Sequence, residues 1–386
     1  MTTDEDVKKR VNEYRLFEDN ELRIEIADEV VVIELLEGQA EIFGTPISLH
    51  KRYTLPPGFR AAVFTYKGAL VEVVGKTESA YIAQQTPMVL YLNFHHALDM
   101  LREKTEEALA KNPNADVRGP RVMIAGPTDV GKSTLCRILC SYAVRRNRTP
   151  VYVDLDVGQR SISIPGSIGA LYVEKPADII EGFDSRGAYV YSFGYLSPSD
   201  NIPLYEILMH ELAMAVDKKC KMTPAANIGG VIINTCGWIK GGGYQTIVKA
   251  AEEFAVDVVI VLDHERLYSE LQRDLVNSIK VLHYPKSGGV EARSRELRRS
   301  LRLAAIHRIV SVPIEAGLVN HVLALMPPDA CVDQSLLHRN CIGFLVVVAV
   351  DTEKKTITIL SPQPHPLPSR IALCTEITFV DDQTSF

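Results

Sequence analysis

The chain has 386 residues, of which 46% are hydrophobic and 23% charged, and its formal net charge is −6. This length suffices for two or three domains, and the negative charge argues against a protein coated in basic surface, so a nucleic-acid partner would have to be held by a local basic patch. Because no apolar run approaches 18 residues and the start, MTTDEDVKKR, has no apolar core, we expect neither a membrane span nor a signal peptide.

The first part of the chain, residues 1–98, is predicted to be a small β domain. From about Glu21 to Gln85, short alternating or β-branched segments such as ELRIE and RAAVFTY are separated by Gly and Pro turns, which is typical of a sandwich or barrel. Residues 92–111 then carry apolar side chains at spacings of three and four. This spacing predicts a helix that bridges into the next domain.

Strand and helix patterns alternate over the central part, residues 99–308. Apolar segments such as RVMIAG and VDVVIVLD are separated by helical ones such as KSTLCRILCSYAVRR. This alternation predicts an α/β domain with a parallel sheet that has helices on both faces. Residues 309–386 return to β patterns, among them FLVVVAVD and KTITILSP. The predicted architecture is therefore an α/β domain flanked by small N- and C-terminal β domains.

The seven cysteines are scattered along the chain and include no CxxC pair. This argues against a zinc site and against a disulfide framework. A reducing compartment, the cytosol or the nucleus, is the natural inference.

The stretch GPTDVGKST lies between a predicted strand and a predicted helix and fits G-x-x-x-x-G-K-[ST]. Backbone N–H groups of such a loop point at nucleotide phosphates, and Gly126 and Gly131 permit the close approach. Lys132 would bridge the β- and γ-phosphates, and Ser133 would place its hydroxyl on Mg²⁺. Because no NKxD-type guanine motif occurs, ATP is favoured over GTP. The predicted nucleotide-binding residues are Gly126, Thr128, Asp129, Val130, Gly131, Lys132, Ser133 and Thr134.

Asp154 and Asp156 are expected at the carboxyl end of the next strand, where ligands gather in open α/β sheets. Two residues apart on a strand, their side chains point to the same face. A carboxylate there can hold Mg²⁺ or accept the proton of an attacking hydroxyl, so Ser133, Asp154 and Asp156 are the candidate metal ligands. The spacing leaves open which aspartate is the base, and it also allows an aspartate that only caps a turn.

Four further motifs, taken together with the phosphate loop, resemble the polynucleotide 5′-hydroxyl kinase family. They are DLDVGQ with SIPGSIGAL, SFGYLSPSDN, INTCGWIKGGGYQ and PKSGGVEARSRELRR, and AEIFGT and LSPQPHPLP extend the resemblance over the whole chain. Within the family, the chain is most similar to RNA 5′-kinases that are subunits of the eukaryotic pre-mRNA cleavage and polyadenylation complex. The resemblance implies a P-loop kinase domain between two β domains. It also implies transfer of the γ-phosphate of Mg-ATP to the 5′-hydroxyl of RNA, in tRNA splicing and mRNA 3′-end processing.

The resemblance also implies roles for individual residues. Asp156 matches the family's general base, and Trp238 matches a residue that stacks on a nucleobase, which suits an acceptor site of weak sequence preference. Glu21 is a candidate for contacting adenine, with an exposed strand glutamate that has no role as the alternative. The residues expected to hold RNA are Gln159, Ser197, Pro198 and Trp238.

A segment rich in arginine, about 286–302, follows the last strand of the central domain. Its Arg293 and Arg298 match the arginines of the family's lid, which would stabilise the charge of the transferring phosphoryl and exclude water. The alternative is a basic face for the RNA backbone. With Lys132 and Asp156, these two arginines complete the predicted catalytic set.

Two other functions remain open at this point. One is an ATP-bound scaffold subunit of an RNA-processing complex with little or no kinase activity, and the other is the ribosomal-RNA-processing kinase of the wider family. The resemblance implies as partners the subunits of the cleavage and polyadenylation factor and the tRNA splicing endonuclease complex. It also implies a location in the nucleus.

Overall fold

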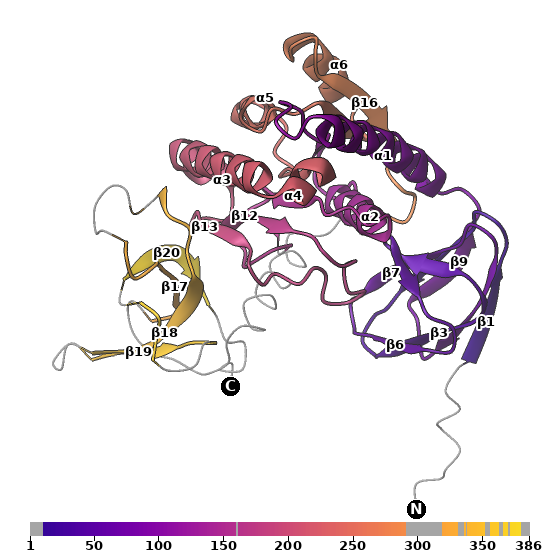
Figure 1. Cartoon of the computed structure of the whole chain (residues 1–386). Helices are drawn as coiled ribbons and strands as arrows, with labels where there is room; N and C mark the ends of the chain where they lie inside the picture. Colours follow the sequence, from indigo (N-terminus) through magenta and orange to yellow (C-terminus); the bar gives the residue numbers. More distant parts are fainter. Residues whose placement is uncertain are drawn as a thin grey trace, which may run out of the picture.

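The computed structural model describes residues 11–159, 161–290, 319–330, 336, 338–351, 356–362, 366–369 and 371–379. Two β units lie at the two ends of a central domain of strands and helices (Figure 1). Arg293, Arg298 and the rest of the predicted lid from residue 291 onward lie outside the described residues.

The N-terminal unit is a sandwich of two antiparallel sheets. One sheet has the strand order β1-β8-β3-β6, formed by β1 (Val11–Leu16), β8 (Ala69–Val74), β3 (Val31–Gly38) and β6 (Arg52–Leu55). The other has the order β5-β4-β7-β2-β9, formed by β5 (Thr45–Ile47), β4 (Ala40–Ile42), β7 (Arg60–Phe64), β2 (Glu21–Glu25) and β9 (Ser79–Ala83). Leu22 and Ile24 of β2 are buried in the core between the sheets. The alternate residues of this strand, Glu21, Arg23 and Glu25, therefore point to the outer face.

A buried polar contact joins the sandwich to the central domain. Glu41 of β4 is buried and accepts hydrogen bonds from Tyr142 Oη and Arg145 Nη1 of helix α2 (Lys132–Arg145). Helix α1 (Met88–Lys111) leads from the sandwich into the central domain and packs against α2. The predicted domain boundary at residue 98 lies within α1, and that at residue 308 lies outside the described residues.

The central sheet has seven strands in the order β13-β12-β11-β14-β10-β15-β16. The strands are β13 (Tyr189–Ser192), β12 (Ser167–Tyr172), β11 (Val151–Asp154), β14 (Val231–Asn234), β10 (Arg121–Ala125), β15 (Val258–Leu262) and β16 (Lys280–Tyr284). From β11 to β16 neighbouring strands are parallel, whereas β12 and β13 form an antiparallel extension. The predicted fold class is confirmed, but the sheet is mixed rather than purely parallel.

Helices cover both faces of this sheet, as the strand β10 illustrates. Its residues Val122 and Ile124 pack in the cluster that includes α1 and α2, whereas Met123 and Ala125 pack in the cluster on the opposite face. Alternate side chains of this fully buried strand therefore contribute to two hydrophobic cores, one on each face of the sheet. The remaining helical elements are η1 (Pro198–Asp200), α3 (Ile202–Met222), α4 (Pro224–Gly229), α5 (Gly242–Glu253) and α6 (Glu265–Asp274). No helix in the described part of the chain combines the length and apolar character needed to cross a bilayer.

The C-terminal sheet packs against the loop that follows Asp156. Its strand order is β19-β18-β17-β20, formed by β19 (Thr356–Leu360), β18 (Gly343–Asp351), β17 (His321–Leu325) and β20 (Ala372–Thr378). Ile164 of the loop lies in the hydrophobic core of this sheet, and Gly166 (φ 84°) lies so close to Ile377 that a Cβ on it would be 2.1 Å from Ile377 Cδ1. The C-terminal unit therefore supports the loop that carries Gln159.

Candidate active site

The phosphate loop has a backbone that only particular residues adopt. Gly126 and Gly131 have φ angles of 148° and 90°, and Asp129 also has a positive φ, 56°. A Cβ on Gly126 would lie 2.8 Å from the carbonyl oxygen of Leu262, so a larger residue would displace the loop from β15. α2 begins at Lys132, directly after Gly131. The N-terminus of a 14-residue helix therefore faces the site, which favours an anion.

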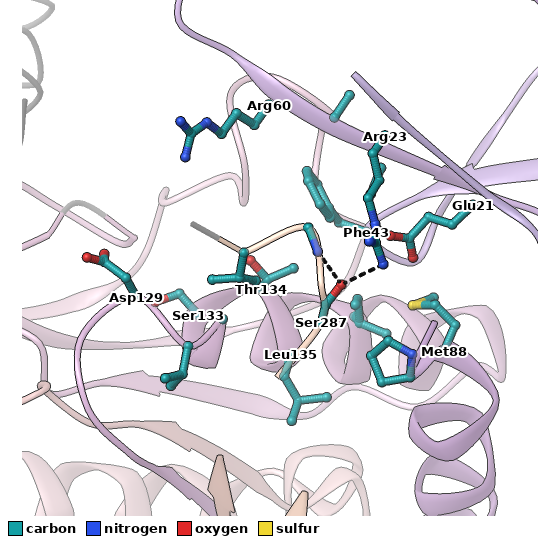
Figure 2. A pocket seen from close by; sticks show the side chains of 18 of the residues that line it. Glu21, Arg23, Phe43, Arg60, Met88, Asp129, Ser133, Thr134, Leu135 and Ser287 are labelled. Atoms are coloured by element: carbon teal, nitrogen blue, oxygen red, sulfur yellow. Dashed lines mark hydrogen bonds and ion pairs between the residues drawn. The ribbon is translucent and has the colours of Figure 1, made fainter. Parts of the chain in front are cut away.

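A cavity of about 250 Å³ lies between this helix start and the outer face of the sandwich. Figure 2 shows Ser133, Thr134 and Leu135 on one side and Glu21, Arg23 and Arg60 on the other. The sandwich wall is the outer face of the sheet β5-β4-β7-β2-β9. On this face Arg23 of β2 pairs in register with Tyr81 of β9, and Glu25 pairs with Arg60 of β7. The residues that line this wall are Glu21, Arg23, Ile24, Glu25, Arg60, Ala61, Ala62, Ser79 and Tyr81.

Two carboxylates lie at the edge of the sheet beside the loop. Asp154 ends β11, and its Oδ1 accepts hydrogen bonds from Asn234 Nδ2 at 2.9 Å and from the backbone N–H of Asp156 at 3.0 Å. Burial, together with the Asp156 carboxylate, raises the pKa of Asp154 to about 6. Asn234 Nδ2 also donates to Ser133 Oγ at 3.2 Å, so the amide links the loop to the carboxylate.

Lys132 is buried beside these carboxylates. Its Nζ donates to the carbonyl oxygen of Pro127 at 2.6 Å, across the loop. Burial lowers the pKa of the Lys132 amine, and the Asp156 carboxylate opposes this effect. The amine of the Lys132 side chain is thus held inside the loop, beside Asp156, which also lines the cavity.

Trp238 lies on a loop that touches the phosphate loop. The indole is half-buried over the start of α5, where a Cβ on Gly243 would be 2.6 Å from its Cδ2. A Cβ on the neighbouring Gly237 would lie 2.3 Å from Cγ2 of Thr128. The 3₁₀ turn η1, which contains Pro198, packs against α5. The structure therefore brings the segments of Pro198 and Trp238 together at one end of the central domain.

Three family descriptions match the chain in succession. They are the N-terminal beta-sandwich domain of polyadenylation factor over residues 15–105, the mRNA cleavage and polyadenylation factor CLP1 P-loop over 126–309, and the pre-mRNA cleavage complex II protein Clp1 over 298–381. A protein from Brugia malayi named as a CLP1 homolog is 52% identical, and the match covers 98% of both chains. This chain belongs to the CLP1 family.

Other relatives and solved structures agree with the CLP1 family. The Homo sapiens protein named polyribonucleotide 5′-hydroxyl-kinase Clp1 is 41% identical, over 97% of this chain and 98% of the human one. The Caenorhabditis briggsae protein clpf-1 is 43% identical, over 97% and 99%. A structure of Clp1p in complex with Pcf11p has a TM-score of 0.80, with 18% identity, over 97% of this chain and 99% of that one. The three-part fold is therefore that of solved Clp1 proteins.

Most of the predicted site residues lie around one cavity of this CLP1-family fold. Gln159 is exposed at its rim, and Glu21, expected to be either an adenine contact or an exposed residue, is buried in its wall. Gly126, Thr128, Asp154, Ser197, Pro198 and Trp238 do not line this cavity. The predicted residues that do are Glu21, Asp129, Val130, Gly131, Lys132, Ser133, Thr134, Asp156 and Gln159.

Some polar residues of the site were not predicted from the sequence. Arg23 lies two residues from Glu21, and the alternation in ELRIE places both on one face, a signal that was available. Asn234 ends the strand VIIN at the same edge of the sheet as Asp154, which the strand-end argument could also have found. Arg60 and Tyr81 carried no such signal, because only strand pairing brings Tyr81 beside Arg23 and Arg60 beside Glu25.

The oxygen atoms at the strand ends fit Mg²⁺. The described residues contain no group of three or more His, Cys, Asp or Glu side chains that could hold a metal ion. Mg²⁺ needs only one or two carboxylates, because it keeps waters and takes substrate phosphates as ligands. Asn234 Oδ1 is buried without a hydrogen-bond partner next to Ser133 and Asp154, and a water of the ion would satisfy it.

Replacing Asp154 by Asn is expected to stabilise the protein without nucleotide at neutral pH. The folded-state pKa of about 6 lies above the ordinary 3.8, so the stability that Asp154 contributes is complete below about pH 4 and is lost as the pH rises through 6. At neutral pH the ionised carboxylate costs about 3 kcal/mol, from about 1.4 kcal/mol per pKa unit. Urea denaturation without Mg²⁺ measures the difference. A gain as large near pH 4.5 as near pH 7.5 would contradict this origin.

Proposed function

We propose that the chain is an ATP-dependent kinase that transfers the γ-phosphate to the 5′-hydroxyl end of RNA. The observation that carries this proposal is the cavity in which a phosphate loop, the Lys132 amine and the Asp156 carboxylate meet. A relative that is 41% identical over 97% of this chain is named polyribonucleotide 5′-hydroxyl-kinase. A second Clp1p–Pcf11p structure, with a TM-score of 0.81, is described as explaining ATP loss in a point mutant, which supports ATP as the nucleotide.

The phosphate loop and Lys132 would hold the triphosphate. Backbone N–H groups at the start of α2 would donate to the phosphates, and Lys132 would exchange its acceptor, the Pro127 oxygen, for a phosphate oxygen. Mg²⁺ near Ser133 and Asp154 would neutralise charge on the phosphates. The sandwich wall from Glu21 to Tyr81 would contact the nucleoside end of ATP.

Asp156 would act as the base on the acceptor side. Its Oδ1 accepts the backbone N–H of Gly158 at 2.9 Å, which fixes the orientation of the carboxylate. A carboxylate held in this way can align the 5′-hydroxyl for in-line attack and accept its proton. Gln159, exposed in the same turn, would contact the terminal nucleotide. Arg293 and Arg298, which lie outside the described residues, stay predictions for the lid.

Replacing Trp238 by Ala is expected to weaken RNA binding. Stacking of a base on an aromatic ring contributes about 1–3 kcal/mol, so the KM for RNA should rise about 5- to 150-fold. The KM for ATP should stay the same, because Trp238 does not line the cavity. Steady-state kinetics with each substrate varied in turn, with Trp238→Phe as the conservative control, would measure this. Equal changes in both KM values would argue against a stacking role for Trp238, against which Ser197 and Pro198 would hold the RNA.

The partners and location are part of the proposal. A Clp1p relative has been solved bound to Pcf11p, which supports a subunit of the cleavage and polyadenylation factor as a partner of this chain. A tRNA splicing endonuclease complex as second partner and a nuclear location rest on the family resemblance. Affinity capture of the full chain from nuclear and cytoplasmic fractions would test both.

The proposed activity is tested by transfer of labelled γ-phosphate from ATP to a short RNA with a 5′-hydroxyl end. The same oligonucleotide with a 5′-phosphate is the matched control, because it offers no acceptor at that end. Labelling of the first RNA alone would support the kinase. Tight ATP binding without labelling of any RNA or DNA end would favour an ATP-bound scaffold instead.

A further inference from the structure

The cavity has a third wall that neither the phosphate loop nor the sandwich supplies. After β16 the chain crosses the cavity as residues 286–290, here called the strap, of which Ser287, Gly289 and Val290 line the cavity. A Cβ on Gly131 would lie 3.4 Å from Val290 Cγ2, so the end of the strap lies against the phosphate loop. Lys286 Nζ lies 3.5 Å from Asp263 Oδ2 at the other end.

Arg23 of the sandwich contacts the middle of the strap. Its Nη2 donates to Ser287 Oγ at 3.4 Å and to the carbonyl oxygen of Gln85 at 3.2 Å, and its Nε donates to Glu21 Oε1 at 2.7 Å. Figure 2 shows Ser287 between Arg23 and the start of α2. The side chain of Arg23 is only 11% exposed, and its hydrogen bonds to Glu21 and Ser287 are partly buried, whereas the Gln85 acceptor lies at the surface.

The strap glycines pack directly on the same guanidinium group. A Cβ on Gly289 would lie 2.9 Å from Arg23 Cδ and Nε, and a Cβ on Gly288 would lie 3.0 Å from Nη1. The strap backbone therefore runs against the arginine, and a larger residue at Gly289 would force the arginine or the strap to shift. Glu21, whose other oxygen accepts from Thr86 Oγ1 at 2.7 Å, holds the guanidinium in place from the opposite side.

We propose that Arg23 is a positioning residue that holds the strap against the phosphate loop, so that the third wall of the cavity is in place before ATP binds. The part that concerns ATP rests on the proposed function. Arginine suits this position because its planar fork binds Glu21, Gln85 and Ser287 at once, which a single ammonium group cannot do. The sandwich, far away in the sequence, thereby sets the place of a strap that belongs to the central domain.

The seating is tested without nucleotide by tryptic cleavage after Lys286, followed by mass spectrometry. Gly289→Ala should speed cleavage about fivefold or more, because its Cβ meets Arg23 and favours local opening. In an Arg23→Ala background, the same Gly289→Ala change should have little further effect, because the clash is gone. This non-additivity in a double-mutant cycle supports the seating. Independent, additive effects of the two substitutions would overturn it.

Kinetics then separate positioning from a general loss of stability. Gly289→Ala, which displaces the strap but keeps the Arg23 side chain, should raise the KM for ATP about tenfold, as Arg23→Ala should, because a misplaced strap weakens contacts with the bound nucleotide. A rise in Arg23→Ala alone would mean that Arg23 acts only through direct contact with ATP, and this would overturn the proposal. The control Arg52→Ala, at an exposed arginine of the same sandwich, should leave the KM for ATP unchanged. A destabilised sandwich alone would lower kcat and leave the KM for ATP as it is, and this result would overturn the proposal. If the wild type transfers no phosphate, ATP dissociation constants measured by calorimetry replace KM. The positioning role of Arg23 can therefore be tested even if the kinase proposal fails.

Discussion

Asp156→Asn is expected to lower kcat for RNA phosphorylation by about 10²–10⁴-fold, the range attributed to a positioned general base. The amide oxygen can still accept the N–H of Gly158, so the local turn and the fold should persist. ATP affinity should remain close to that of the wild type, because the phosphate loop and Lys132 are untouched. Steady-state transfer of labelled phosphate at saturating ATP and RNA measures kcat, and calorimetry measures ATP affinity.

The matched control for Asp156→Asn is Asp28→Asn, which removes the same charge from an exposed turn of the sandwich. It should phosphorylate RNA at the wild-type rate. If Asp156→Asn keeps more than about a tenth of kcat, Asp156 is not the base in the sense of general base catalysis.

Lys132→Ala is expected to weaken ATP binding and to lower kcat by about 10²–10³-fold, the size of effect seen when one preorganised donor to a transition-state charge is removed. The Lys132 amine is buried, and the phosphate loop, residues 126–134, contains no other basic side chain that could replace it. Calorimetry measures the ATP dissociation constant, and labelled transfer at saturating ATP measures kcat.

Lys218→Ala is the control for Lys132→Ala, since Lys218 is an exposed helical lysine on α3. Circular dichroism of both variants should match that of the wild type. Wild-type transfer by Lys132→Ala would show that the triphosphate does not bind at this loop.

The sequence allowed the fold and the family to be predicted, and both predictions are confirmed. The α/β alternation was readable because each strand and helix carries its own apolar period, as in RVMIAG, which forms β10 as expected. The strand β12 was missed, because SIGALY is short and follows a stretch rich in Ser, Gly and Pro. The mixed character of the sheet follows from this strand, which turns back beside β11.

The candidate site was predictable only on the side of the phosphate loop. Lys132, Ser133 and Asp156 follow strand ends, where local sequence dictates what faces a ligand. Arg23, Arg60 and Tyr81 come from three strands of the sandwich and become neighbours only through strand register. The contact of Arg23 with the strap depends on two domains packing together, and no periodicity in either segment indicates it.

The sequence by itself determined the phosphate loop, because the glycine positions and the strand–helix context are local requirements of the backbone, and the structure has positive φ at both Gly126 and Gly131. Only the tertiary structure decided that Glu21 is buried in the cavity wall and that Arg23 reaches Ser287, 264 residues further along the chain. Contacts at that separation are fixed by how the sandwich docks through Glu41 onto α2, and docking depends on the summed packing of both surfaces rather than on any one segment.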